Sequence, residues 1–181
     1  MTTTKKITNK KVVRQGVLLT TKIICIFLAG FIVLQFLFGF CYFRGNNMFP
    51  AVRDGDLLIS FKLDPIVKED LVLYKFTDNQ GKTETKVGRM VATEGDKIDI
   101  TDNGEILING CVPYEEVFYL TDLPESSKIS YPYTVPQGEV FILNDYRSGT
   151  TDSYNDSRSF GSIKKSDLEG KVWLLLRRRG F

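Results

Sequence analysis

Two polar stretches of the sequence carry most of the side chains that could do chemistry. The first, Gly45–Leu58, directly follows a long apolar run and contains the step Phe49-Pro50 and the turn Asp54-Gly55, both of which interrupt regular structure. The second, Asp145–Arg158, is dense in Asp, Ser and Arg without hydrophobic periodicity, so we expect a loop held by its own hydrogen bonds. A loop beside a membrane that leads into a strand is well placed to meet a peptide that emerges from the membrane.

The composition excludes several kinds of site. The 181 residues include no histidine, which excludes Ser-His-Asp triads and removes the commonest zinc ligand. The three cysteines, Cys25, Cys41 and Cys111, do not form a metal-ligand cluster, and two of them fall inside the apolar run. The sequence therefore implies neither a metal nor a cofactor. The net charge of +2 is too small to indicate a nucleic-acid partner.

The N-terminal part predicts a membrane anchor. Residues 1–16 are polar and basic, and residues 17–43 are apolar with few interruptions. At about 1.5 Å per residue, Ile23–Phe43 is long enough to cross a hydrocarbon core of about 30 Å. Because basic flanks stay in the cytoplasm, we expect a single-pass protein of the cell membrane: a cytoplasmic tail over 1–16, a transmembrane helix over 17–43 and an extracellular domain over 44–181. The alternative is a cleaved secretory signal peptide, although no clear small-x-small cleavage site follows the apolar run.

The extracellular part predicts a β-domain. Short segments rich in β-branched, leucine and aromatic residues alternate with turn signals, and no long segment has helical periodicity. Asp102-Asn103-Gly104 between two such segments predicts a hairpin, because Asn-Gly tolerates positive φ. The expected strands are Leu57–Phe61, Leu71–Phe76, Val87–Ala92, Lys97–Ile100, Glu105–Asn109, Glu139–Leu143 and Lys171–Leu176.

Two further segments allow two interpretations each. Pro113–Pro136 is either an irregular insertion whose aromatic side chains pack onto the sheet or an aromatic surface that binds a partner. Arg177–Arg179 is either a solvated terminus or a contact with anionic lipid head groups.

The stretch Gly45–Leu58 resembles the nucleophile loop of the type I signal peptidases, in which Ser-Met-x-Pro precedes Gly-Asp and an apolar strand. The matching residues are Met48, Pro50, Gly55 and Asp56. Asn47 stands at the position of the nucleophilic serine. Four further blocks follow in the family's order: Glu69–Val72, Gly88–Asp96, Gly104–Gly110 and Val135–Gly161. The resemblance implies a mostly β fold, an antiparallel signal-peptidase-type β-domain with a surface groove, preceded by one N-terminal transmembrane helix.

The resemblance also implies where catalytic residues should stand. In the family a desolvated lysine removes the proton of the serine. Here Gly88 stands at the lysine position and Tyr154 at the position of a supporting serine. Lys86 would share a strand face with Gly88 at about 7 Å. With both dyad positions altered, we expect no catalytic residues and no enzymatic activity. The alternative is a signal peptidase with a non-standard dyad such as Lys86 with Ser157.

Signal-peptidase-like proteins with both dyad positions altered act as non-catalytic pilus-assembly chaperones in Gram-positive bacteria. The resemblance therefore implies an assembly factor in sortase-dependent pilus polymerisation, with pilin subunits and sortase as partners. A third option is a subunit that stabilises an active peptidase. The candidate groove residues are Met48, Phe49, Pro50 and Met90. The residues expected to hold the structure of the loop are Arg89, Asp145, Arg147, Asp156, Ser157, Arg158 and Gly161.

Overall fold

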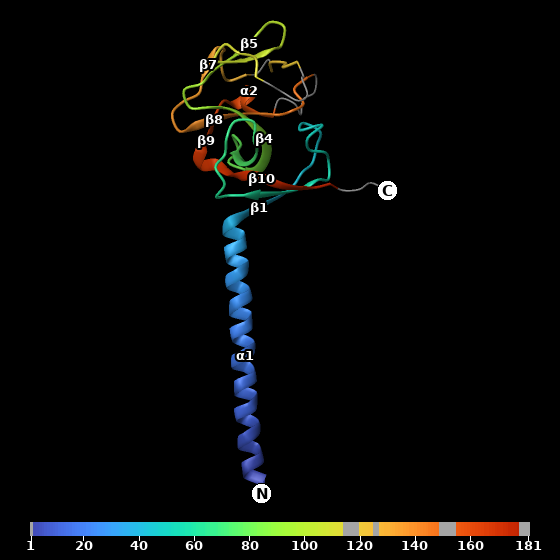
Figure 1. Ribbon diagram of the computed structural model, residues 1–181, viewed down its shortest axis with the longest axis vertical. Helices are drawn as coiled ribbons and strands as arrows, with labels where there is room; N and C mark the ends of the chain where they lie inside the picture. Colours follow the sequence, from blue (N-terminus) through green and yellow to red (C-terminus); the bar gives the residue numbers. More distant parts are fainter. Residues whose placement is uncertain (1, 114–119, 125–126, 149–154, 178–181) are drawn as a thin grey trace. The chain divides into compact units, whose positions relative to one another are not determined.

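A computed structural model describes residues 2–113, 120–124, 127–148 and 155–177 of the chain. The chain forms two units, an N-terminal helix that ends at Leu37 and a β-domain that begins at Phe38. Figure 1 shows the two units, coloured along the sequence.

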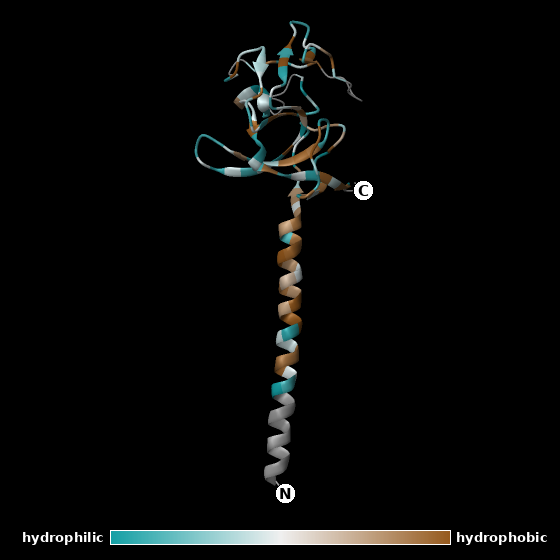
Figure 2. Ribbon diagram, turned by 60° about the vertical axis from the view of Figure 1, so that its left-hand side comes forward, coloured by the Kyte–Doolittle hydropathy of each residue, from teal (hydrophilic) through white to brown (hydrophobic). Residues whose placement is uncertain are grey.

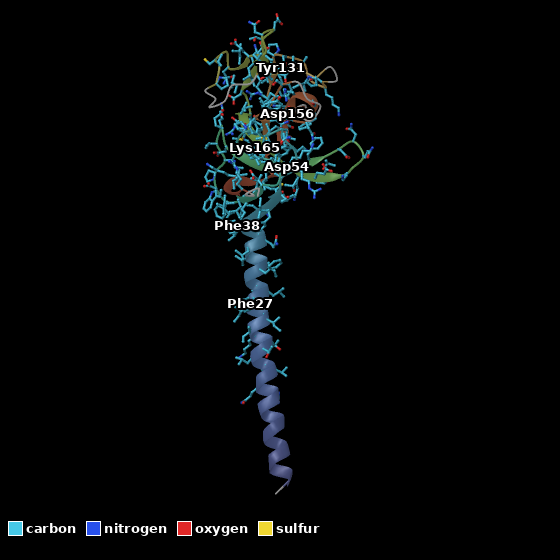
Figure 3. The ribbon with its side chains drawn as sticks, turned by 90° about the vertical axis from the view of Figure 1, so that its right-hand side faces the viewer. Phe27, Phe38, Asp54, Tyr131, Asp156 and Lys165 are labelled. Carbon is cyan, nitrogen blue, oxygen red and sulfur yellow. The ribbon has the colours of Figure 1, made fainter. Side chains whose placement is uncertain are left out.

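The N-terminal unit is one helix, α1 (Thr2–Leu37). Its part Arg14–Leu37 is long and apolar enough to cross a membrane, and none of it is buried against protein. Figure 2 shows the apolar residues along this helix, and the side chain of Phe27 points away from the helix axis (Figure 3). Because water would not solvate such a surface favourably, a hydrocarbon environment is its natural surrounding.

The boundaries of the anchor differ from those that the sequence predicted. The helix ends at Leu37 and not at Phe43, and the next residues form strand β1 (Phe38–Tyr42). The reason is pairing: each residue of β1 has a partner in the antiparallel strand β2 (Leu57–Phe61), and its aromatic residues favour a strand. At the other end, the helix includes Thr2–Gly16, which the sequence predicted to be a separate polar tail.

The β-domain is built on a seven-stranded antiparallel sheet with the order β1-β2-β10-β3-β4-β8-β9. A second sheet of three strands has the order β6-β5-β7. The remaining elements are β3 (Leu71–Thr77), β4 (Thr83–Thr93), β5 (Lys97–Ile100), β6 (Ile106–Ile108), β7 (Tyr133–Thr134), β8 (Glu139–Leu143), α2 (Ser157–Phe160), β9 (Ile163–Lys164), the 3-10 turn η2 (Lys165–Asp167) and β10 (Leu168–Leu176). This architecture confirms the predicted fold class.

All seven strands that the sequence predicted are present, with shifts of a few residues at their ends. The predicted hairpin is confirmed as β5–β6, in which Gly104 adopts φ +78°. A Cβ at this glycine would also lie 3.2 Å from the backbone nitrogen of Thr121, so the turn requires glycine for both reasons.

Three clusters of buried side chains hold the sheets together. One, around Phe141 and Leu143, joins the two sheets. A second, around Met48, Leu58 and Leu73, packs the loop after β1 against β2 and β3. The third lies around Tyr74 and Ile142. These clusters fix the strands whose edges form the site described below.

Candidate functional site

A slot of about 390 Å³ opens between the ends of two strands, and we call it the β1–β4 slot. Its lining residues are Cys41, Tyr42, Phe43, Arg44, Asn47, Glu84, Thr85, Lys86, Val87 and Asn155. The two sides come from segments that are far apart in the sequence, one from β1 and the loop after it, the other from β4.

Both walls of the slot are strand edges. β1 is an outer strand of the sheet, and in the part of the chain that the structure describes its one paired strand is β2. β4 pairs with β3 over Thr83–Arg89 but with β8 only over Arg89–Thr93. Among the described residues, Thr83–Gly88 therefore has no paired strand on its second side. An unpaired strand edge offers backbone donors and acceptors to an added strand.

Asn47 is a lining residue of the slot that is held by two hydrogen bonds. Its side-chain Nδ2 donates a hydrogen bond to Oδ1 of Asn144 at 2.9 Å. Its backbone carbonyl accepts a hydrogen bond from the N–H of Tyr146 at 3.0 Å. These two bonds join the loop after β1 to the chain that follows β8, so the Asn47 amide is held in place by both its backbone and its side chain.

Gly88 is buried on β4. A Cβ at this position would collide with Cγ2 of Ile142, and it would lie 3.3 Å from the carbonyl oxygen of Leu143 and 3.4 Å from Cε1 of Tyr74. The space that a lysine side chain would need at this position is therefore occupied by the side chain of Ile142.

Lys86 is the half-buried cation of the slot. Its Nζ donates a hydrogen bond to Oδ1 of Asn155 at 2.5 Å and lies 3.8 Å from the centre of the Phe76 ring. Burial lowers the pKa of Lys86, against the opposing effect of acidic neighbours, Glu84 first. A desolvated ammonium with an amide and a ring as neighbours is more readily neutralised than one in water.

The structure does not pair Lys86 with Ser157. Ser157 is fully buried, and its Oγ accepts a hydrogen bond from the N–H of Ile142 at 3.0 Å. Within the described residues, Lys86 has Asn155 as its hydrogen-bond acceptor instead. The geometry therefore does not provide the lysine–serine pair that the sequence left open. Tyr154, the other residue considered for this site, lies outside the described residues.

A buried ion pair directly follows Asn155 in the sequence. Arg158 and Asp156 are both inaccessible to solvent, with Nε of Arg158 at 2.9 Å from Oδ1 of Asp156 (Asp156 is labelled in Figure 3). Asp156 also caps α2 by accepting from the N–H of Arg158, and its Oδ2 accepts from the N–H of Asn144. Nη1 of Arg158 donates to the carbonyls of Asp122 and Arg147.

A second ion pair lies closer to the surface. Nε and Nη2 of Arg89 donate to the two carboxylate oxygens of Asp145 at 2.7 and 2.8 Å. Of the other predicted loop residues, Arg147 is buried, and Gly161 ends α2 at φ +92° with its N–H on the carbonyl of Ser157. The structure thus brings the predicted loop residues together, while their contribution to stability stays a prediction.

The predicted groove residues do not line the slot. Met48 is fully buried and Met90 is 2% exposed, and both pack in the core because their side chains face the interior of the sheet. Phe49, which is 40% exposed, and Pro50 belong to the turn after Asn47. Sequence reasoning missed the wall made by β1, because residues 38–43 continue the apolar composition of the helix, and it missed Asn155, for which the sequence carried no signal.

The family follows from a match over most of the chain. Residues 15–176 match the model of the family described as signal peptidase, peptidase S26. The chain belongs to this family. It is 28% identical to signal peptidase I of Bacillus caldolyticus over 151 residues, which cover 76% of this chain and 78% of that protein. It is 30% identical to thylakoidal processing peptidase 1 of Arabidopsis thaliana over 122 residues, 61% of this chain and 34% of that protein.

A solved structure of a signal peptidase I from Enterococcus faecalis is also similar. It has a TM-score of 0.46 and 20% identity, and the match covers 61% of this chain and 98% of that one. The apolar helix and the membrane-associated peptidases among the relatives, which include an inner membrane protease subunit of Arabidopsis thaliana mitochondria, indicate a membrane-anchored protein.

These matches correct one expectation. From Asn47 and Gly88 the sequence predicted that the chain is not an enzyme. Its relatives in the peptidase S26 family are named as enzymes, signal peptidase I among them, and this contradicts that prediction. The residues at the two dyad positions therefore do not by themselves establish that the chain is inactive.

Proposed function

We propose that this member of the signal peptidase family binds an extended segment of an exported polypeptide in the β1–β4 slot. The observation that carries the proposal is the pair of strand edges that face the slot, one from β1 and one from Thr83–Gly88 of β4. An extended segment placed there would pair with unpaired backbone groups on both sides. The volume of the β1–β4 slot, about 390 Å³, also lies within the range of ligand sites, about 300–1,000 Å³.

The setting that we propose for this binding is the outer face of the cell membrane. In this arrangement α1 crosses the membrane once with its basic end in the cytoplasm, as the charge bias of residues 1–16 favours. β1, which supplies one wall of the slot, starts at the residue after α1 ends.

The bound segment in this proposal belongs to a pilin subunit, and the protein assists a sortase in pilus polymerisation. Asn47 and Gly88 support this, because altered dyad positions are what pilus-assembly proteins resembling signal peptidases have. The hydrogen bond from Asn47 to Asn144 and the packing of Ile142 against Gly88 both stabilise these altered positions. Presentation of an extended pilin segment to a sortase requires binding at the membrane surface, which the slot would provide.

Cleavage of the bound segment is the second candidate function. The names of the relatives favour it, and so does Lys86, whose pKa is lowered by burial within the slot. A lysine with a lowered pKa can act as a general base and accept the proton of an attacking hydroxyl or water. Binding in the slot is common to both candidates.

A substitution that fills the slot tests the binding. We expect Thr85→Trp to abolish binding of an extended fluorescent peptide by the full chain in nanodiscs, because Thr85 lines the slot on β4. Thr83→Trp, on the same strand but outside the lining, is the matched control and should bind normally. Equal binding by wild type and Thr85→Trp would refute the site.

Two further readouts separate the candidates. In cells that lack the native protein, Thr85→Trp should fail to restore pilus polymerisation while Thr83→Trp restores it. Polymerisation that does not depend on the protein would refute the pilus setting. Mass spectrometry of the incubated peptide detects cleavage, and cleavage by wild type that Lys86→Met abolishes would establish the second candidate.

A further inference from the structure

Of the charged side chains that line the β1–β4 slot, the acidic one has an ion-pair partner, whereas Lys86 has a neutral amide as its partner. Among the described residues that line the slot, Glu84 is the one acid, and Nζ of Lys82, outside the slot, lies 2.6 Å from its carboxylate. Lys86, two residues further along β4, has no carboxylate within ion-pair distance among the described residues. On the opposite wall, the guanidinium of Arg44 lies 5.8 Å from the centre of the Tyr42 ring. The slot therefore presents cations whose neighbours are amides and rings.

Lys86 is the more informative of these cations, because it is half-buried whereas Arg44 is exposed. A partly buried ammonium group has lost some of its hydration, and a hydrogen bond to a neutral amide compensates for only part of that loss. A carboxylate provides a charge-assisted hydrogen bond, which is about twice as strong as one to a neutral acceptor. The amide of Asn155, an exposed residue on a polar loop, is a partner that a ligand could displace.

We propose that the β1–β4 slot selects an extended peptide with an acidic side chain, whose carboxylate displaces the Asn155 amide as the partner of Lys86. The inference rests on the proposed function, since it names the chemistry of the segment that the slot binds. The carboxylate comes from a side chain and not from a chain end. Four consecutive residues on each side line the slot, Cys41–Arg44 at the end of β1 and the start of the loop after it, and Glu84–Val87 on β4, so the bound chain continues past Lys86 on both sides. The lowered pKa of Lys86 agrees with this, because a carboxylate would remove the cost of charging it.

The test measures the affinity of three peptides for the full chain in nanodiscs of uncharged lipid. The peptides share one β-favouring sequence and differ in the central residue and in the C-terminal end. The first peptide carries a central Glu and blocked ends, the second a central Gln and blocked ends, and the third a central Gln and a free C-terminal carboxylate. We expect the Glu peptide to bind about tenfold more tightly than either other peptide, the value of one charge-assisted hydrogen bond. This preference should decrease as salt is raised.

Two variants and a control assign the preference to Lys86. Lys86→Gln should bind the Glu and Gln peptides equally, and Lys86→Arg should keep a preference for Glu. Lys97→Gln removes the same charge from an exposed position on β5 and should leave the preference unchanged. A thermal melt of each variant, with an unchanged midpoint, establishes that the fold is intact.

Each remaining outcome overturns a specific step. Equal binding of the Glu and Gln peptides by wild type refutes the acidic preference and leaves the proposed binding in place. A preference for the free C-terminal carboxylate refutes the assignment to a side chain. Absence of binding by all three peptides refutes both the inference and the proposed function. A Glu preference that survives in Lys86→Gln shows that another cation is responsible.

Discussion

Removal of the Arg158 side chain should be among the most destabilising changes in the β-domain. Arg158→Ala leaves the carboxylate of Asp156 buried without its counter-ion, since both side chains are inaccessible to solvent. The carboxylate keeps the backbone N–H of Asn144 and of residue 158 as donors. It loses the guanidinium hydrogen bonds, at 2.9 and 3.2 Å from Nε and at 3.0 Å from Nη2. The carbonyls of Asp122 and Arg147 lose a donor at the same time.

The expected loss follows from the burial of the pair. Breaking a buried ion pair by removing one partner costs about 3–5 kcal/mol of the free energy of unfolding, because an uncompensated charge stays behind. For the β-domain, which begins at Phe38, about 140 residues give an unfolding entropy of about 0.3 kcal/mol per degree. A loss of about 4 kcal/mol then corresponds to a decrease of the melting temperature by about 13 °C.

Fluorescence of Trp173, the one tryptophan of the chain, provides the assay. Its Nε1 donates to Asp64 at 2.9 Å, and this contact on β10 breaks on unfolding. Arg89→Ala is the matched control, because the Arg89–Asp145 pair has similar bonds but its side chains are 27% and 13% exposed. It should lose about 1 kcal/mol, or about 3 °C. A decrease for Arg158→Ala no larger than that for Arg89→Ala would refute the reasoning from burial.

Two further predictions concern single positions. Gly88→Ala should lower the free energy of unfolding in urea by about 1–3 kcal/mol, because the new Cβ collides with Cγ2 of Ile142. Adding Ile142→Leu, which removes that methyl group, should recover part of the loss. An unchanged urea midpoint for Gly88→Ala would contradict this account of the packing. Asp96 should stabilise the fold by about 2 kcal/mol above pH 4: burial raises its pKa, but bonds from Lys68, Thr93 and Asn109 outweigh this and lower it from 3.8 to about 2. Because the pKa of Asp96 is lower in the folded state, this contribution decreases as pH falls from about 4 to about 2. The melting temperatures of wild type and Asp96→Asn should therefore converge over that range. A difference in melting temperature that persists at pH 2 would contradict the prediction.

Most of the sheet could be predicted because its strands are bounded by strong local signals. Leu71–Phe76 and Glu139–Leu143 consist of apolar and aromatic residues except for one charged residue each, Lys75 and Glu139, and both form strands with buried residues. Asp102-Asn103-Gly104 fixed the β5–β6 hairpin through backbone chemistry alone. Each of these signals depends on a few neighbouring residues. In this fold the tertiary contacts favour the same structure as the local signals do, so the local prediction is correct.

The end of the anchor could not be predicted in the same way. Residues 38–43 continue the apolar composition of α1, and hydropathy does not distinguish a lipid-facing helix from a strand at a sheet edge. Pairing of Phe38 with Phe61, and of Tyr42 with Leu57, decides the matter, and these contacts come from residues far along the chain. The slot depends on this strand, so a prediction that extended the helix to Phe43 also lost one wall of the site.

The two dyad positions show why sequence reasoning found the family but drew the wrong conclusion about activity. The resemblance to the family assigns Asn47 and Gly88 to those positions. In the structure Asn47 donates a hydrogen bond to Asn144, and the side chain of Ile142 occupies the space beside Gly88. It does not follow that the site lacks reactive groups. Lys86 lies in the slot one strand repeat from Gly88, with a lowered pKa and no ion-pair partner among the described residues. A segment bound in the slot would lie beside this lysine, which could pair with a carboxylate when charged and could act as a general base when neutral.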